Sequence, residues 1–329
     1  MQSQQTSSRN GRRDTWILVG LFALMLAGLA GLAIATGWTE TRDALLRLTG
    51  AEVLLLLVLS LVNYGFRGLR WHLFATRLGL ATSLLQNMRH FIGGFAMSAT
   101  PGRVGELVRM RWIRRETGWS FERTAPLVLM DRGSDLVAMA LVLSLSLALS
   151  AGGIAGGLPV VALALVGAYI ATHPKLLREA ANIAHRITGR FARLLVKVRR
   201  ASASLSAFRS PWILVSATLL GAIGWFAEGA AFYYLLSWLG AETGLWMAVA
   251  IFLFSTLAGG LTGAPGGIGG AEATMIALLT LEGIPLAISI PATLIIRLTT
   301  LWFAIILGLV VFPLAERASK RAAHADATT

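Results

Sequence analysis

Apolar runs longer than a bilayer is thick constrain this chain more than any other feature of its sequence. About 20 apolar residues in a helix cross the hydrocarbon core, and the run from Trp16 to Trp38 contains no charged residue. Tryptophans, which favour membrane interfaces, bracket it, and no small-x-small cleavage site follows it. Because 56% of the 329 residues are hydrophobic and 14% are charged, we expect an all-α polytopic membrane protein with a retained first helix rather than a cleaved leader.

Basic residues are concentrated in four segments, which sets the expected topology. Of the 29 Lys and Arg residues, 25 lie before Trp16, within residues 65–123, within residues 173–210, or after Pro313. Cytoplasmic loops carry an excess of Lys and Arg, so we expect these four segments to face the cytoplasm. Both termini would then be cytoplasmic in a multi-pass protein of the bacterial inner membrane.

The basic segment from His173 to Ser210 has apolar residues close to helical spacing and a single acid, Glu179. It predicts an amphipathic helix that anionic lipid headgroups anchor on the inner leaflet, an interpretation we favour over a regulatory role. Its aromatic residues are limited to Phe191 and Phe208, too few for the stacking platforms of nucleic-acid binders. Despite the net charge of +13, no nucleic acid is expected as a partner.

Two Pro-Gly loops interrupt the hydrophobic sequence, PGRVGE from Pro101 and PGGIG from Pro265. Proline and glycine break helices and leave N–H groups free at the start of the next half-helix, where anions bind. An isolated Pro-Gly pair would be a simple turn, but two copies flanked by small residues favour a functional cavity. The expected loop residues are Pro101, Gly102, Gly105, Pro265, Gly266, Gly267 and Gly269.

The two halves of the chain align as a repeat. Matching Gly79 to Gly240 places Arg67 opposite Glu228. Three added residues in the second half then bring the prolines of both loops into register and Arg132 to within one residue of Arg297. Three crossings separate the matched points, an odd number, so the halves would enter the membrane from opposite sides. This is the inverted repeat typical of alternating-access transporters.

The expected architecture has about six full transmembrane helices plus two re-entrant helical hairpins. Residues 84–100 are too polar and too rich in glycine for an ordinary span, and such backbone is tolerated only where protein or a water-filled cavity covers it. The full spans are expected at about 16–38, 51–74, 125–150, 158–172, 211–239 and 286–313, and the second interrupted segment at about 245–281. The expected domains are a cytoplasmic basic tail at 1–14, one transmembrane domain at 15–314 (repeat 1 at about 51–150, the amphipathic helix at about 173–210, repeat 2 at about 211–313) and a cytoplasmic tail at 315–329.

Charged side chains within the apolar segments are the candidate binding residues. Each costs at least about 2.5 kcal/mol at membrane depth, so they pair or line a pathway, and arginine's planar fork suits phosphate. For Asp131, Arg132 and Asp135 a structural ion pair remains as good an interpretation as a ligand contact. Arg109, Arg111, Arg114 and Arg115 are expected at the cytoplasmic surface. The candidates for binding or translocation are Arg67, Arg70, Arg103, Glu106, Arg132, Asp135, Glu228, Glu272 and Arg297.

Signatures of catalysis and metal binding are missing. The chain has no cysteine and no HExxH, GxSxG or Walker motif, and its five histidines lack metal-like spacing. His90 alone lies within an expected re-entrant segment, where it is a weak candidate for substrate contact. We expect no catalytic residue, cofactor or metal, and therefore no enzyme; a membrane-embedded transferase would have to use Glu106 or Glu272 as its base.

The ordered set of these motifs resembles the lysylphosphatidylglycerol synthase transmembrane region family, also called the flippase-like domain family. The resemblance rests on the segment from Arg67 to Trp71, the P-x-R-x-G-E loop with Arg109 after it, the pair Arg132 and Asp135, and the P-G-G-I-G loop followed by Glu272. It implies movement of lipids or lipid-linked headgroups between leaflets, through a cavity lined by Arg103, Glu106, Arg132, Asp135, Glu272 and Arg297. Members that synthesise aminoacyl lipids carry a soluble catalytic domain after the membrane region. We therefore do not expect synthase activity here.

The leading hypothesis is translocation of an anionic phospholipid or a polyprenyl-linked headgroup. The alternative is a non-catalytic accessory protein that binds a lipid and presents it to a lipid-modifying enzyme or a glycosyltransferase. Small-residue spacing, such as Gly263 with Gly267, fits an internal helix contact and a dimer equally well.

Overall fold

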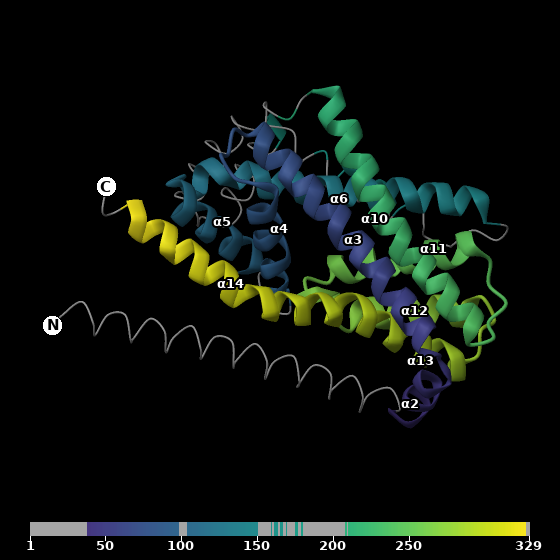
Figure 1. The fold of residues 1–329 in the computed structure, drawn as a ribbon. Helices are drawn as coiled ribbons and strands as arrows, with labels where there is room; N and C mark the ends of the chain where they lie inside the picture. The colour runs from purple at the N-terminus through teal and green to yellow at the C-terminus, as the bar shows by residue number, and fades with distance from the viewer. Residues whose placement is uncertain are drawn as a thin grey trace, which may run out of the picture.

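The computed structural model describes residues 38–98, 104–150 and 210–326, with isolated residues between 159 and 208. Regular structure in these residues is helical throughout (Figure 1). Four helices are long and apolar enough to cross a membrane, Gly50–Arg77, Phe121–Leu149, Pro211–Trp238 and Leu286–His324. The all-α membrane class is therefore confirmed. The expected first span at 16–38, apart from its last residue, lies outside the described residues, and so do most of the span at 158–172 and of the amphipathic helix at 173–210.

Two long helices of equal length lie at the centre of the fold. Helix α3 (Gly50–Arg77) and helix α10 (Pro211–Trp238) each contain 28 residues. Both end before a glycine with positive φ, Gly79 at 87° and Gly240 at 84°. In both, the residue after the glycine donates its N–H back to a carbonyl of the last turn, the usual glycine C-cap arrangement. The glycines that align the two halves in sequence thus end equivalent helices.

Shorter helices follow each long one. Helix α4 (Leu84–Gly93) and helix α11 (Leu245–Leu261) begin at the same distance beyond the aligned glycines. A 3-10 turn, η1 (Gly94–Met97), continues α4, and α5 (Val104–Thr117) begins beyond the residues that are not described. The second half has the 3-10 turn η4 (Pro265–Gly267) followed by α12 (Gly270–Leu281). The break around Pro265 therefore occurs where the sequence predicts it, whereas the first loop, at 99–103, lies outside the described residues.

The last helix contains the expected final span and extends beyond it. A helix α6 (Phe121–Leu149) closes the first half. Its counterpart is α13 (Leu286–Arg297), which continues through a π-helical turn, η5 (Leu298–Trp302), into α14 (Phe303–Asp326). The helix continues through Pro313, where the expected membrane span ends. In this extension Glu316 accepts a hydrogen bond from the indole of Trp112 on α5, at 2.8 Å.

Close approach of backbones positions these elements. Helices α3 and α10 run in opposite directions, α3 starting beside the short helix α2 (Trp38–Arg47) and α10 ending towards it (Figure 1). A Cβ added at Gly224 would lie 3.3 Å from the Cα of Asn63, so glycine allows the two helices to pack closely. At Gly308 in α14 an added Cβ would lie 2.2 Å from the backbone nitrogen of Ala96 in η1. Small residues therefore set the spacing around the first helix break.

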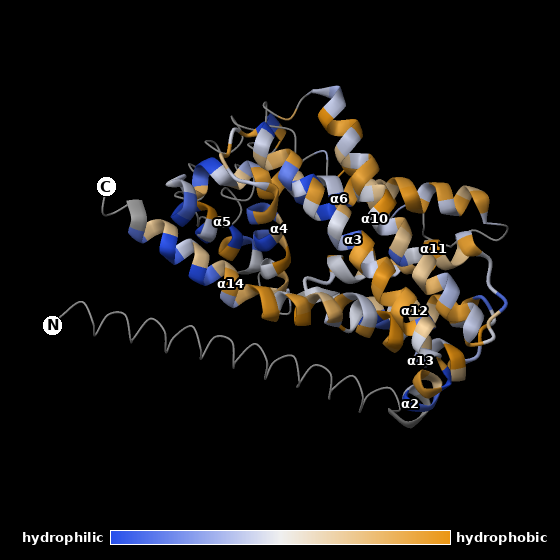
Figure 2. Cartoon of the chain, in the orientation of Figure 1, coloured by the Kyte–Doolittle hydropathy of each residue, from blue (hydrophilic) through white to orange (hydrophobic). Residues whose placement is uncertain are grey.

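Hydropathy distinguishes the surfaces of the molecule. Hydrophobic residues cover α10, α11 and α12, whereas hydrophilic residues gather on α5 and the last part of α14 (Figure 2). Large apolar side chains stay exposed, including Leu85, Trp212 and Leu281, which suits a surface that contacts lipid. The charged residues inside the helical layer are the exception, and they form the site described next.

Candidate functional site

A cavity of about 510 Å³ lies between the two halves of the chain. Its volume is in the range of ligand-binding sites. Glycines of both Pro-Gly loops line it, namely Gly105, Gly266 and Gly267. Its charged lining residues come from α3, α5, α6, α10 and α13 and are Arg67, Glu106, Arg109, Arg132, Asp135, Glu228 and Arg297. Both arginines that follow the loops in sequence therefore share a single cavity.

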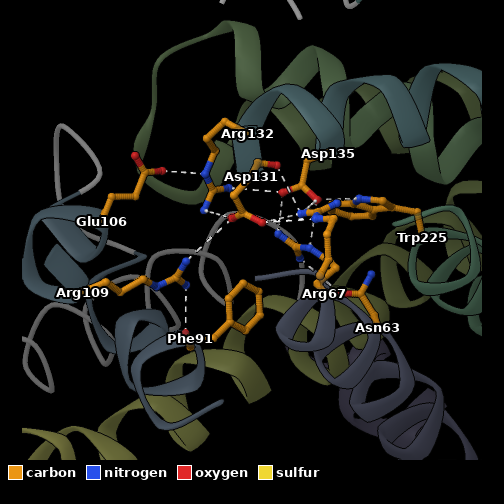
Figure 3. A network of polar contacts seen from close by, with 10 residues as sticks. Asn63, Arg67, Phe91, Glu106, Arg109, Asp131, Arg132, Asp135 and Trp225 are labelled. Atoms are coloured by element: carbon orange, nitrogen blue, oxygen red, sulfur yellow. Dashed lines mark hydrogen bonds and ion pairs between the residues drawn. The ribbon is translucent and has the colours of Figure 1, made fainter. Parts of the chain in front are cut away.

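Asp135 on α6 is the centre of a network of ion pairs (Figure 3). Arg67 of α3 donates two hydrogen bonds to its carboxylate, at 3.0 and 2.7 Å. Trp225 of α10 donates a third through its indole N–H, at 3.2 Å. Arg67 also donates to the side chain of Asn63, at 3.1 Å, and its guanidinium lies 4.7 Å from the ring of Trp225. The network therefore joins the three long helices α3, α6 and α10.

Arg70, one turn after Arg67, lies beneath the cavity rather than on its wall. Its side chain is fully buried, and its Nη2 donates to Asp131 and to Asp135, both at 2.7 Å. It does not line the cavity. A buried charge with two counter-charges holds helices in place, so the geometry of Arg70 and Asp131 is that of a structural ion pair.

Arg109 is a cavity residue, which corrects the expectation that it lies at the cytoplasmic surface. Its residue exposure is 2%, and its Nη2 donates to the carbonyl of Phe91 at 2.9 Å. The expectation failed because helix α4, with Phe91, folds over α5 and covers Arg109. Arg111 and Arg115 are partly buried and pair with Glu316, each at 2.6 Å, while Arg114 is exposed as expected.

Arg132 and Glu106 connect the first half-helix to α6. The Nε of Arg132 lies 2.6 Å from a carboxylate oxygen of Glu106. A longer contact of 3.5 Å joins Arg132 to Asp135. Both side chains of the pair with Glu106 are partly exposed, 31% for Arg132 and 20% for Glu106. This makes it more accessible than the pairs around Asp135.

An equivalent pair occurs in the second half. The Nε of Arg297 lies 2.6 Å from Glu272, and its Nη2 donates to the carbonyl of Gly266 at 2.8 Å. The other carboxylate oxygen of Glu272 accepts the backbone N–H of Gly269 at 2.6 Å. Gly266, Gly267 and Gly269 all have positive φ, which favours glycine. Glu272 itself does not line the cavity; it holds the loop and Arg297 in place.

Glu228 on α10 differs from the other cavity acids. It is 4% exposed and lines the cavity. Among the described residues no hydrogen bond or ion pair to its carboxyl group is seen, although the charges of Arg67 and Arg297 act on it. A buried carboxyl without a partner is costly, and such groups in membranes mark binding or transport pathways.

The remaining candidates fall outside the cavity or outside the described residues. Pro101, Gly102 and Arg103 are not described, nor is the side chain of Pro265. His90 is fully buried with its Nε2 3.0 Å from Glu116, and it does not line the cavity. In the described part of the chain no group of three potential metal ligands occurs.

Among the polar and aromatic residues of the cavity that sequence reasoning missed are Tyr64, Trp225 and Arg109. The first two lie on the faces of α3 and α10 that turn inward, and no local pattern distinguishes them from apolar packing residues. Arg109 had a usable signal. It follows Glu106 by one helical turn, so both side chains project from the same face of α5.

Helices of membrane-spanning length around a buried, charged cavity define the chain as an integral membrane protein with an internal polar site. The family model for the lysylphosphatidylglycerol synthase transmembrane region matches residues 16–308. The chain belongs to this family. It is also similar to two UPF0104 membrane proteins of Methanothermobacter thermautotrophicus. One is 25% identical over 328 residues, which cover 89% of this chain and 94% of the relative. The other is 30% identical over 90 residues, 27% of each chain.

Proposed function

We propose that the protein is a non-enzymatic lipid translocator of the bacterial inner membrane. It moves an anionic phospholipid or a polyprenyl-linked lipid headgroup between leaflets through the polar cavity. The observation that carries the proposal is the cavity itself, in which Arg67, Arg132 and Arg297 from both halves of the chain line one space. Buried arginines at membrane depth are costly, and their forked donors match phosphate oxygens.

The two equivalent halves support a transport mechanism. Helices α3 and α10 have equal lengths, matching C-caps and opposite directions. In the proposed architecture α4 with α5, and α11 with α12, are re-entrant hairpins from opposite faces, and six helices cross fully. This inverted repeat permits alternating access by rocking one half against the other about the cavity.

Topology and domain organisation follow from the same proposal. The basic segments, both termini among them, face the cytoplasm. One transmembrane domain spans residues 15–314 between a tail at 1–14 and a tail at 315–329, of which the last turns of α14 form part. The headgroup passes between the two Pro-Gly loops while its acyl chains stay in the bilayer, next to the apolar surfaces of α10, α11 and α12.

The test is leaflet exchange in liposomes that contain the purified protein. Fluorescent analogues of phosphatidylglycerol and phosphatidic acid are placed in both leaflets, and reduction by dithionite from outside reports which molecules reach the outer leaflet. The protein is expected to accelerate exchange. Arg297→Gln and Arg132→Gln are expected to slow it at equal protein content, while the exposed Arg114→Gln should match the wild type.

Two results would contradict the proposal. Folded protein that accelerates no anionic lipid would exclude translocation, and tight lipid binding in that case would favour the accessory role beside a lipid-modifying enzyme or glycosyltransferase. If transport persists in Arg297→Gln and Arg132→Gln, the cavity is not the path.

A further inference from the structure

Arg109 carries donor groups that no described residue satisfies. Its residue exposure is 2%, and its Nη2 donates to the Phe91 carbonyl. Its Nε and Nη1 are buried and find no hydrogen-bond acceptor among the described residues. The carboxylate of Asp131 stays 3.9 Å from Nη1, which is too far for a hydrogen bond. Because a buried charged donor without an acceptor is costly, the cavity wall at Arg109 is built for an acceptor from elsewhere.

The surroundings of Arg109 hold its guanidinium group in a fixed position. Its Cζ lies 4.4 Å from the ring centre of Phe91 and 5.2 Å from that of Trp71. Such stacking fixes the plane of the group and leaves its edge free to donate. Glycine at position 94 makes room for it, since a Cβ there would lie 2.2 Å from the Nε of Arg109. The donors are therefore preorganised.

A second guanidinium group faces the same point. The Nη2 of Arg132 also lies 3.9 Å from the carboxylate oxygen of Asp131 that faces Arg109 (Figure 3). Asp131 is itself neutralised by Arg70, at 2.7 Å. Arg67, by contrast, already donates to Asp135 and to a neutral side chain. Among the cavity arginines of this network, Arg109 and Arg132 thus have donors to offer.

Charge in this network favours an added anion. Its charged side chains are four arginines, Arg67, Arg70, Arg109 and Arg132, against three acids, Glu106, Asp131 and Asp135. One positive charge is therefore in excess among these ion-paired side chains; this count leaves out Glu228, the cavity acid that stands outside the pairs. Glu106 is the acid with the most exposed side chain, at 20% against 1% for Asp131 and 7% for Asp135, so its carboxylate is the easiest to displace.

We propose that Arg109 and Arg132 together bind the phosphoryl group of the translocated lipid, and that Glu106 occupies Arg132 as an internal competitor while no lipid is bound. This inference rests on the proposed function, which supplies the lipid as ligand. It adds that the protein recognises the phosphoryl group of that lipid. A phosphoryl group has enough oxygens to accept from two guanidinium forks at once. Lipid arrival releases Glu106, and departure of the lipid restores its ion pair with Arg132.

The test measures binding to the full chain in detergent, separately from transport. The ligands are phosphatidic acid, phosphatidylglycerol, diacylglycerol and inorganic phosphate, and the readout is the dissociation constant from native mass spectrometry or tryptophan fluorescence. Both phosphoryl lipids are expected to bind, and diacylglycerol is not. Inorganic phosphate should compete at much higher concentration, because it lacks the acyl chains.

Three variants carry the argument. Arg109→Gln is expected to weaken binding of phosphoryl lipids by about tenfold or more, the value of a charge-assisted hydrogen bond. Glu106→Gln should strengthen it by roughly three- to tenfold, because the competing charge is removed. The exposed Arg114→Gln on the same helix should leave it unchanged. Should Arg109→Gln fail to fold, Arg109→Lys retains the charge without the fork and is expected to lose most of the affinity.

The gain of affinity in Glu106→Gln distinguishes competition from a structural role, which would leave affinity unchanged or lower it. Either of those results overturns the proposal, as does equal binding of diacylglycerol. If inorganic phosphate binds as tightly as the lipids, the site still recognises a phosphoryl group, but the proposal that the group belongs to a lipid is wrong. If binding follows the expected pattern but liposomes show no lipid exchange, the proposed function is wrong and the phosphoryl site is supported. If exchange occurs but the variants of Arg109 and Glu106 bind lipid like the wild type, translocation is supported and the phosphoryl site is wrong.

Discussion

Replacing Asp135 by asparagine tests whether buried ion pairs hold the three long helices together. The carboxylate of Asp135 accepts two hydrogen bonds from Arg67 at 3.0 and 2.7 Å, one from Arg70 at 2.7 Å and one from Trp225 at 3.2 Å. Its side chain is 7% exposed. Asparagine keeps one oxygen but turns an amide NH₂ towards a guanidinium group and removes the negative charge. Two buried arginines then lose a shared counter-charge.

The expected cost follows from burial. Breaking a buried pair by removing one partner costs about 3–5 kcal/mol. At about 2.1 cal/mol/K of unfolding entropy per residue, 1 kcal/mol corresponds to about 1.5 °C in the unfolding midpoint of a 329-residue chain, so Asp135→Asn should lower the midpoint by roughly 4–7 °C. In the same network, Glu106→Gln breaks a pair whose side chains are 31% and 20% exposed. That pair should be worth less than about 1 kcal/mol.

The assay is thermal unfolding of detergent-purified protein, followed by the intrinsic fluorescence of its ten tryptophans. Both variants and the wild type are measured in one detergent at one heating rate. Two results would refute the claim that the more buried ion pair contributes more to stability. One is a midpoint for Asp135→Asn within about 3 °C of wild type, and the other is an equal shift for both variants. A large shift for Glu106→Gln alone would refute it as well.

Three further perturbations have expected outcomes in the same or a simple related assay. Glu272→Gln should lower the midpoint by several degrees, because it leaves Arg297 buried without its counter-charge. The double variant Glu272→Gln with Arg297→Met should recover part of that loss. A double variant no more stable than the single variant would contradict this. Gly308→Ala should destabilise the protein, because its methyl group would clash with the backbone of η1. Gly65→Ala, which has open space around it, should be neutral or stabilise the protein by up to about 1 kcal/mol. Equal effects of the two variants on the midpoint would rule out the close contact at Gly308. Glu316→Gln should make the end of α14 accessible to limited proteolysis, since Glu316 ties it to α5; unchanged digestion would show that other contacts hold it.

Local signals predicted much of the fold. Apolar run length predicted α3 and α10 to within a few residues, and the glycines Gly79 and Gly240 end both helices as their alignment implied. The helix break at the second loop also followed from local chemistry, because Pro and Gly act on their own backbone. Beyond the expected span, α14 continues past Pro313, and Glu316 in this part contacts Trp112 of α5.

The candidate site was predictable in part of its membership but not in its pairing. Charges within apolar segments are conspicuous in any sequence, which is why Arg67, Asp135 and Arg297 were named. Arg109 was assigned to the surface, because its burial depends on aromatic residues of α3 and α4 and on glycine at position 94. No spacing within α5 contains that information.

The sequence by itself determined the membrane class, the family and the extent of α3 and α10, because each of these depends on composition or on interactions between near neighbours. The tertiary structure decided which charges neutralise each other and which remain available. Arg67 meets Asp135 across 68 residues, and Trp225 meets it across 90. Only the packing of α3, α6 and α10 brings these groups within hydrogen-bonding distance, and the same packing leaves Arg109 and Glu228 facing the cavity.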